Sequence, residues 1–185
     1  GTGIVTLVVG VPVMLLTGAT SGLMSVASTQ AVAQPLVQNN YLTAIQSAHS
    51  GEWVSAEMGY TGSDKGMLRA RATAIGPWEK YRFAYNGNGN WGSYSFAAQA
   101  YVSTEITFSG TKNGMLRARH GVIQTSERFN IIYNTDGTYS LRSVANGKYV
   151  SVEFGYTGNN AKMLRARATS IGPWLVTKDE LSARL

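Results

Sequence analysis

Three pairs of arginines are the residues in this sequence best suited to bind an anion. Each pair lies in the phrase Met-Leu-Arg-Ala-Arg, where the single intervening alanine places both arginines on one face of an extended strand. Two adjacent guanidinium groups suit phosphate, sulfate or carboxylate. The arginines could instead be solvated or pair with acids of their own repeat, and we favour this interpretation. The predicted basic surface comprises Arg69, Arg71, Arg117, Arg119, Arg165 and Arg167, together with Lys65, Lys112 and Lys162.

Three glutamates, Glu57, Glu105 and Glu153, also recur at a fixed spacing and invite an acid–base interpretation. Glycoside hydrolysis needs two carboxyl groups about 5 to 10 Å apart across one bond. Equivalent positions of three repeats lie in three different lobes, so we predict a structural role, such as pairing with an arginine of the same repeat. The sequence has no cysteine, and its two histidines occupy unrelated repeat positions. We therefore predict no metal site, no cofactor and no enzymatic activity.

Aromatic residues in glycine-containing turns are the best candidates for ligand binding. Tyr60, Phe108 and Tyr156 are each followed by Thr-Gly or Ser-Gly, and polar side chains lie a few residues further on. An aromatic ring flanked by hydroxyl and amide groups could form a shallow site that stacks against a sugar. The alternative is that each ring folds back onto the body of the protein. The predicted ligand-binding residues are Tyr60, Asp64, Phe108, Asn113, Tyr156 and Asn159.

All of these residues are positioned by one internal repeat. Met67, Met115 and Met163 open the arginine phrase at a constant step (115 − 67 = 163 − 115 = 48), and a fixed period of this size indicates a repeat architecture. Val54 and Ala56 alternate with their neighbours as in a half-buried strand, helix signals are poor, and turns rich in glycine and asparagine separate the strand-like segments. Three units of about four strands predict an all-β fold, the β-trefoil, with repeats at about 41–89, 90–137 and 138–185.

The repeat phrases resemble those of the fascin-like β-trefoil family. The first repeat carries the resemblance at Gly51 to Glu57, at Leu68 to Arg71 and at Ile75 to Glu79, and the third repeats most of it. The resemblance covers about 41–174. It implies a trefoil fold and, as an activity, the cross-linking of actin filaments. Two tryptophans that follow Gly-Pro, Trp78 and Trp174, are expected to fill the core of such a fold.

Two places depart from the family's phrases. The second repeat reads Ile123-Gln124-Thr125-Ser126-Glu127 and lacks Gly-Pro-Trp. The third continues as Leu175-Val176-Thr177-Lys178, where the period calls for glutamate and then an aromatic residue. A trefoil closes its barrel by pairing its last strand with its first, here near 41–45, so this charged ending argues against a regular closing strand.

The first 40 residues stand outside the repeat. Residues 4–16 form an apolar run, and Ala31-Val32-Ala33 has the small residues of a cleavage site. We therefore expect 1–33 to be a cleaved secretory signal peptide, 34–40 a short leader and 41–185 the trefoil of an extracellular protein. An uncleaved anchor is the alternative, although the run is shorter than the roughly 20 residues of a membrane span.

Together these features predict a secreted, non-catalytic and monomeric binding module that recognises a glycan or another extracellular polymer. The net charge of +6 favours anionic partners or simply solubility, and we expect no nucleic acid. The resemblance implies a second possibility, filamentous actin, against which the secretory signal and the single trefoil both count. A third is a protein–protein interaction or inhibitor trefoil, for which Trp91 is the only candidate contact.

Overall fold

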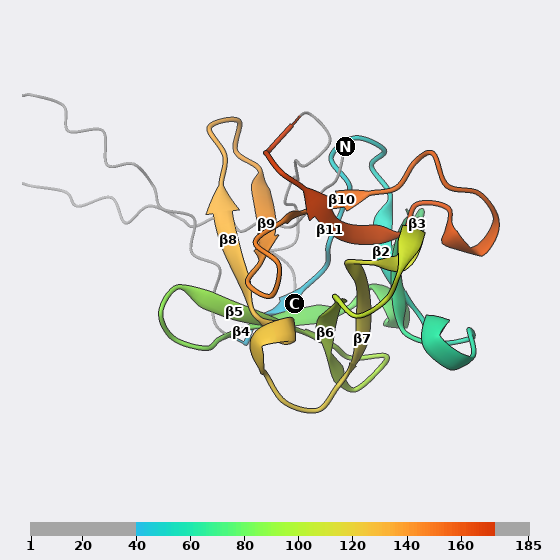
Figure 1. Cartoon of the computed structure of the whole chain (residues 1–185), viewed down its shortest axis with the longest axis horizontal. Helices are drawn as coiled ribbons and strands as arrows, with labels where there is room; N and C mark the ends of the chain where they lie inside the picture. Colours follow the sequence, from blue (N-terminus) through green and yellow to red (C-terminus); the bar gives the residue numbers. More distant parts are fainter. Residues whose placement is uncertain (1–39, 173–185) are drawn as a thin grey trace, which may run out of the picture.

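Eleven short β-strands and five 3-10 turns make up residues 40–172, the part of the chain that this computed structural model describes (Figure 1). The strands are β1 Leu42–Thr43, β2 Trp53–Glu57, β3 Met67–Ala72, β4 Tyr81–Tyr85, β5 Asn90–Ser95, β6 Ala100–Glu105, β7 Met115–His120, β8 Phe129–Tyr133, β9 Tyr139–Ser143, β10 Tyr149–Val152 and β11 Leu164–Ala168. The 3-10 turns are η1 Gly62–Asp64, η2 Pro77–Glu79, η3 Gly110–Lys112, η4 Thr125–Glu127 and η5 Gly158–Asn160. No helix within 40–172 is long and apolar enough to cross a membrane. The predicted signal peptide and all but the last residue of the leader lie outside the described residues.

Strands β1, β4, β5, β8 and β9 form the barrel part of the fold. Strand β4 pairs with β1 and β5, β5 also pairs with β8, and β8 pairs with β9, all antiparallel. The turn between β4 and β5 contains Gly87 and Gly89 at φ angles of 81° and 73°, which glycine adopts without a steric penalty. The segment expected to close the barrel, 173–185, lies outside the described residues.

Three hairpins, one from each repeat, form the cap: β2–β3, β6–β7 and β10–β11. Backbone hydrogen bonds join each hairpin to the next. They run from Ala118 N–H to Gly66 O (2.8 Å), from Ala166 N–H to Gly114 O (2.7 Å) and from Ala70 N–H to Lys162 O (3.0 Å). Because these bonds connect repeat-equivalent positions and close a ring, the cap has pseudo-threefold symmetry. The β-trefoil predicted from the 48-residue period is confirmed.

The hydrophobic core takes the same positions from each repeat. In the arginine phrase, leucine and the intervening alanine point into the core while the arginines lie on the other face. The phrase therefore alternates as predicted for a half-buried strand. The repeat-equivalent core residues are Val54, Val102 and Val150; Leu68, Leu116 and Leu164; and Ala70, Ala118 and Ala166.

The tryptophans behave differently from the sequence prediction. Trp78 is 53% exposed and is not a core residue, whereas its neighbour Glu79 is only 5% exposed. The Glu79 carboxylate accepts the Gly76 N–H at 2.8 Å, which orients turn η2 with the glutamate inside and leaves the tryptophan outside. Trp174 lies outside the described residues. Trp91, the predicted surface contact, is half-buried and packs against the core.

Candidate functional site

A buried methionine cluster lies where the three cap hairpins meet. Met67, Met115 and Met163 are fully buried together. The turn-borne aromatics Tyr60, Phe108 and Tyr156 pack against this cluster, each partly buried. The alternative in which these rings fold back onto the protein is thus the observed arrangement.

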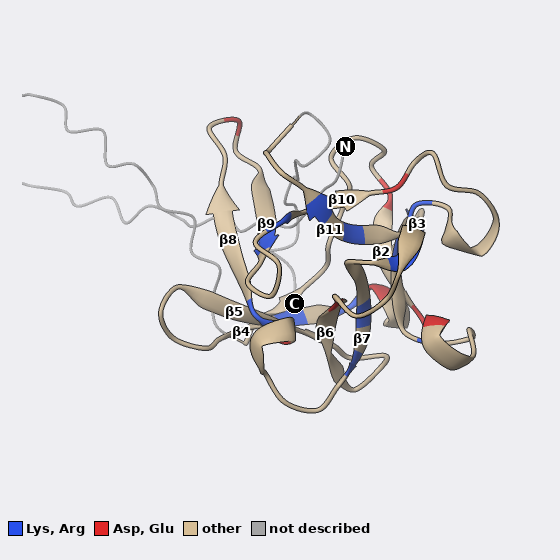
Figure 2. Ribbon diagram, viewed as in Figure 1, with Lys and Arg blue, Asp and Glu red and all other residues tan. Residues whose placement is uncertain are grey.

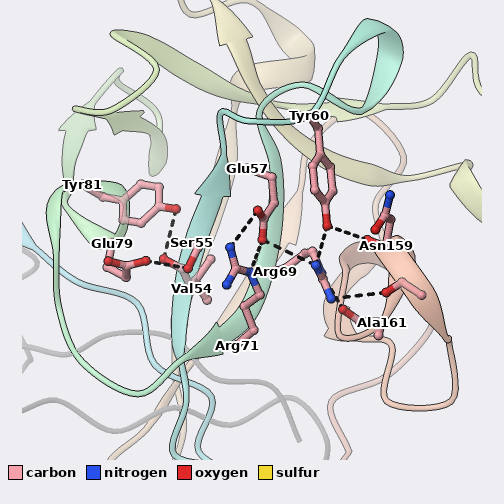
Figure 3. Close-up of polar contacts among 11 residues, drawn as sticks. Val54, Ser55, Glu57, Tyr60, Arg69, Arg71, Glu79, Tyr81, Asn159 and Ala161 are labelled. Carbon is pink, nitrogen blue, oxygen red and sulfur yellow. Dashed lines mark hydrogen bonds and ion pairs between the residues drawn. The ribbon is translucent and has the colours of Figure 1, made fainter.

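The second arginine of each pair forms an ion pair within its own repeat. Arg71 binds both carboxylate oxygens of Glu57, with Nη2 at 2.9 Å from Oε2 (Figure 3). Hydrogen bonding to Glu57 raises the pKa of Arg71 further, so the guanidinium stays charged. The same bidentate contact joins Arg119 to Glu105 and Arg167 to Glu153. The predicted structural role of the three glutamates is confirmed.

The first arginine of each pair crosses to a neighbouring lobe, which the sequence did not predict. Arg69 Nε donates to Ala161 O at 2.7 Å (Figure 3), and Arg117 Nε donates to Lys65 O at 2.7 Å. Arg165 Nε donates in the same way to Asn113 O. These arginines are therefore neither solvated nor paired mainly within their repeat. Their acceptors are backbone carbonyls, which have no side-chain signature in the sequence.

Two of the three turn aromatics also hydrogen-bond these crossing arginines. Arg69 Nη1 lies 2.5 Å from the Tyr60 hydroxyl, and Arg165 Nη1 lies 2.7 Å from the Tyr156 hydroxyl. The second lobe has Phe108 at this position and offers no hydroxyl. Tyr60 and Tyr156 hence support the cap, and Figure 3 shows Tyr60 pointing at Arg69 rather than outward.

The remaining predicted polar residues also have partners in the scaffold. The Asp64 carboxylate accepts from Lys112 Nζ at 2.5 Å, and Asn113 Nδ2 donates to the carbonyls of Ile106 and Phe108 at 3.0 and 2.9 Å. Lys162 Nζ donates to the Glu52 carboxylate at 2.5 Å.

Lys and Arg do lie on β3, β7 and β11 (Figure 2), yet most of the predicted basic surface is engaged within the protein. Asn159 contributes its carbonyl to Tyr60 O–H at 3.3 Å. Lys65 contributes its carbonyl to Arg117 at 2.7 Å, while the residue as a whole is exposed. Ligand binding by any of these residues stays a prediction.

Two buried glutamates were missed in the sequence. Glu79 accepts the Ser55 hydroxyl at 2.5 Å and the Gly76 N–H at 2.8 Å. In the second lobe Glu127 accepts the Ser103 hydroxyl and, at 2.9 Å, the Gln124 N–H. The sequence does contain a signal for these two buried contacts, because each serine, each N–H donor and each glutamate is 48 residues from its counterpart.

The third lobe differs from the other two at this place. Its repeat-equivalent serine, Ser151, donates to the backbone carbonyl of Arg165 at 3.2 Å. The position of the two glutamates is Leu175, which lies outside the described residues.

A cavity of about 800 Å³ opens beside Ser151. Its walls come from β10 and the loop after it, 151–156, and from the end of β11 and the segment after it, 167–170 with Gly172. Aromatic side chains on this wall are Phe154 and Tyr156, and charged ones are Glu153 and Arg167. Within residues 40–172, no three His, Cys, Asp or Glu side chains gather in a way that could hold a metal ion.

Comparisons with known proteins identify the fold. No family model matches the sequence, and no curated protein matches it. A designed protein with threefold symmetry, ThreeFoil, superposes with a TM-score of 0.61 at 18% identity over 73% of this chain and 94% of its own. A domain of a mosquitocidal holotoxin gives 0.63 at 15% identity, covering 76% of this chain and 17% of the toxin.

A ricin B-like lectin of Macrolepiota procera, solved in complex with lactose, is a further structural neighbour. It gives a TM-score of 0.57 at 13% identity, covering 76% of this chain and 95% of the lectin. At these identities the likeness shows the fold alone. The chain is a β-trefoil, as its repeat period and its strand pairing indicate independently.

Proposed function

We propose that this protein is a non-catalytic carbohydrate-binding module and that the third lobe supplies its binding site. The observation that carries the proposal is the cavity between the loop after β10 and the segment after β11. Its volume, about 800 Å³, falls in the range of small-molecule sites, which are concave, largely apolar and furnished with a few polar groups. The rings of Phe154 and Tyr156 offer apolar surface for a sugar. Ser151, Glu153 and Arg167 offer the polar groups.

The fold supports this proposal. A trefoil of the same overall shape was solved with lactose in the Macrolepiota procera lectin. The site proposed here differs from the threefold set of turn aromatics predicted in the sequence, because Tyr60 and Tyr156 already hydrogen-bond arginines of the cap. Tyr156 belongs to both sets, since it also lines the cavity.

The fascin-like relationship and an extracellular location are parts of the same proposal. The repeat phrases support the relationship, and the apolar run 4–16 with Ala31-Val32-Ala33 supports export. Actin binding through a basic surface is less well supported, because Arg69, Arg117 and Arg165 bind backbone carbonyls of neighbouring lobes. We expect the secreted form to act as a monomer.

The test is a glycan array followed by calorimetry on the purified chain and on a variant with a blocked cavity. Thr169 is exposed and lines the cavity, so Thr169→Trp should fill the entrance and abolish binding. The matched control is Thr73→Trp, the equivalent exposed threonine of the first lobe, which should bind as the unaltered protein does. Filamentous actin is tested in parallel by co-sedimentation. Glycan binding that survives Thr169→Trp, or pelleting with actin alone, would refute the proposal.

A further inference from the structure

We infer that one outer wall of the barrel docks onto an anionic membrane surface. This first wall is formed by β1, β4, β5 and turn η2, whereas the cavity proposed to bind a sugar lies beside β10 and β11. The inference is therefore independent of the proposed function. It comes from comparing the first wall with the second wall, formed by β5, β8, β9 and turn η4, which lies one repeat further along the chain.

The alternation of side chains along β4 directs an arginine outward. Tyr81 and Phe83 are buried in the core, so Arg82 between them faces away from it. Arg82 pairs with Leu42 of β1 on one side and with Tyr94 of β5 on the other. The Arg82 guanidinium lies 4.5 Å from the centre of the Tyr94 ring. One row across three strands thus presents an aliphatic, a cationic and an aromatic side chain.

Turn η2 and the residue after β5 add further exposed side chains to this row. The Phe96 N–H donates to Lys80 O at 3.1 Å, and the Phe96 ring lies 5.8 Å from that of Tyr94. Trp78 precedes Lys80 by two residues, in the turn that the buried Glu79 carboxylate holds in place. The first wall therefore comprises Leu42, Trp78, Lys80, Arg82, Tyr94 and Phe96.

The second wall has the same backbone arrangement with different side chains. The Val144 N–H donates to Arg128 O at 2.9 Å, and Asn130 of β8 pairs with Asn90 and with Arg142. The apolar and aromatic positions of the first wall are here Asn90, Ser126, Arg142 and Val144. Because the same scaffold forms with these smaller or polar side chains, the fold does not require the exposed apolar residues of the first wall.

The first wall carries positive charge from Lys80 and Arg82. The carboxylates of the same repeat are held elsewhere: Glu52 by Lys162, Glu57 by Arg71, Asp64 by Lys112, and Glu79 by Ser55 and Gly76. Exposed apolar patches mark protein or membrane contacts. Cations beside such a patch match an anionic bilayer, which attracts Lys and Arg to its surface and takes up Trp and Tyr rings at the headgroup level.

The geometry of the rings favours a lipid surface over a sugar or a protein. One face of the Tyr94 ring is covered by Arg82, and the rings of Phe96 and Tyr101 meet it at angles of 88° and 73°. Rings that meet edge-on do not form a flat platform for a sugar. A protein partner would need a rigid surface complementary to side chains from several separate elements, whereas lipid headgroups rearrange around them. We therefore commit to an anionic phospholipid bilayer.

The first experiment is co-sedimentation of the full chain with phosphatidylcholine vesicles that contain or lack phosphatidylserine. All variants keep residues 1–39, so any contribution of that segment is common to them. Trp78→Ser combined with Phe96→Val gives the first wall the residues of the second. This double variant should weaken binding to phosphatidylserine vesicles at least about tenfold, because it removes most of the apolar surface that enters the bilayer.

The matched control for the double variant is Ile106→Ser combined with Tyr133→Val. Ile106 and Tyr133 are 42% and 46% exposed, close to the 43% of Phe96, and they lie at the ends of β6 and β8. The control should bind vesicles as the unaltered chain does. Thermal unfolding verifies that both double variants fold.

A pair of lysine variants separates docking from general attraction. Lys80→Gln should weaken binding about fivefold, as expected for the loss of one cation at an anionic surface. Lys65→Gln removes the same charge from an exposed residue of the cap and should leave binding unchanged. Equal losses in the two variants would mean that the net charge of +6 attracts the whole molecule, which would overturn a defined docking wall.

Brominated phospholipids test the contact of Trp78 with the bilayer directly, since bromine quenches the fluorescence of a nearby tryptophan. Trp78→Phe keeps an apolar ring, so vesicle binding should persist while the quenching falls. Trp53 and Trp91 are half-buried and should be quenched less. Unchanged quenching in Trp78→Phe would contradict the proposed orientation, and this measurement stands even if the double variant does not fold.

The outcomes distinguish this inference from the proposed function. No binding to phosphatidylserine vesicles, or equal binding by the wall variant and its control, would overturn the membrane surface. Pelleting with filamentous actin that is lost in the wall variant would assign the wall to an acidic protein and overturn the lipid. Glycan binding that is lost in Thr169→Trp would be untouched by any of these results.

Discussion

Phe108→Tyr should stabilise the protein, because it supplies the one phenol hydroxyl that the ring of arginine–tyrosine contacts lacks. The guanidinium of the second lobe already occupies the equivalent place. Arg117 Nη1 lies 3.8 Å from Glu105 Oε1, and Arg69 Nη1 lies 3.7 Å from Glu57 Oε1. A tyrosine at 108 would hence meet Arg117 as Tyr60 meets Arg69, at 2.5 Å.

The size of the effect follows from the burial of the new contact. A net hydrogen bond stabilises a protein by about 0.5–1.5 kcal/mol, and one to a charged group by about 1.5–3 kcal/mol. Arg117 is partly exposed, at 18% of its side chain, so we expect about 1 kcal/mol. That corresponds to a rise of about 3–4 °C in Tm for a chain of this length. Both are measured by calorimetry and urea unfolding.

The reciprocal variants make the experiment falsifiable. Tyr60→Phe and Tyr156→Phe convert the other lobes to the second-lobe form and should each lower stability by about 1 kcal/mol. If these two variants are destabilised while Phe108→Tyr gains nothing, the second lobe has no room for the hydroxyl. If none of the three changes stability, the arginine–tyrosine contacts do not hold the cap, and our account of the turn aromatics is wrong.

Three further predictions concern backbone strain and pH. Gly66→Ala should destabilise the protein by more than about 2 kcal/mol in urea unfolding, because Gly66 has φ +85° and an added Cβ would lie 2.3 Å from Ala118 O. The control is Gly59→Ala, because an added Cβ there meets open space. Equal losses of stability in the two variants would contradict the explanation by backbone strain. Lys162 occupies the same repeat position and has φ 60°, so Lys162→Gly should raise the free energy of unfolding by about 1 kcal/mol. The variant is compared in a Glu52→Gln background, where the ion pair with Lys162 is already absent. A lower Tm for Lys162→Gly in that background would contradict the prediction. Burial, with Glu79 and Glu57 nearby, raises the pKa of Tyr81 well above its ordinary value; this raised pKa means that stability is fully present below about pH 10 and is lost as pH rises further. Tyr81→Phe, which matches Phe129 of the second lobe, should reduce the fall of unfolding free energy with pH between about pH 9 and 11. It should also lower stability by about 1 kcal/mol, because the hydrogen bond to Val54 O is lost. An unchanged fall over that pH range would refute the attribution of this pH dependence to Tyr81.

Much of the fold was predictable because the repeat samples each position three times. The alternation in Met-Leu-Arg-Ala-Arg predicted strands, and the common spacing of Glu57 and Arg71 in all three repeats made their pairing a natural expectation. The 48-residue step then implied a threefold object, which the ring of bonds among the cap hairpins confirms. Composition and periodicity suffice here because they report on side chains that face a core.

The contacts of the candidate arginines were less predictable, because they run between side chains and backbone carbonyls. Nothing in the sequence marks Ala161, Lys65 or Asn113 as acceptors for arginines of another lobe. Trp78 was assigned to the core for its size, although the buried hydrogen bonds of Glu79 decide the orientation of that turn. Polar satisfaction of a buried carboxylate outweighs the burial of one large ring at the surface, since an unpaired buried charge costs several kcal/mol.

The places where the repeat breaks are therefore the places to look for function. Phe108 and Lys162 each break it within the cap, and in both cases the scaffold contacts around them remain: Arg117 still binds Lys65 O, and Lys162 O still accepts Ala70 N–H. In the third lobe the repeat position of the two buried glutamates is Leu175, which lies outside the described residues. The cavity of about 800 Å³ lies in this lobe, between the loop after β10 and the segment after β11. Because the Ser151 hydroxyl already donates to the Arg165 carbonyl at 3.2 Å, the serine alone has a structural role, and the proposal for this lobe rests on the cavity.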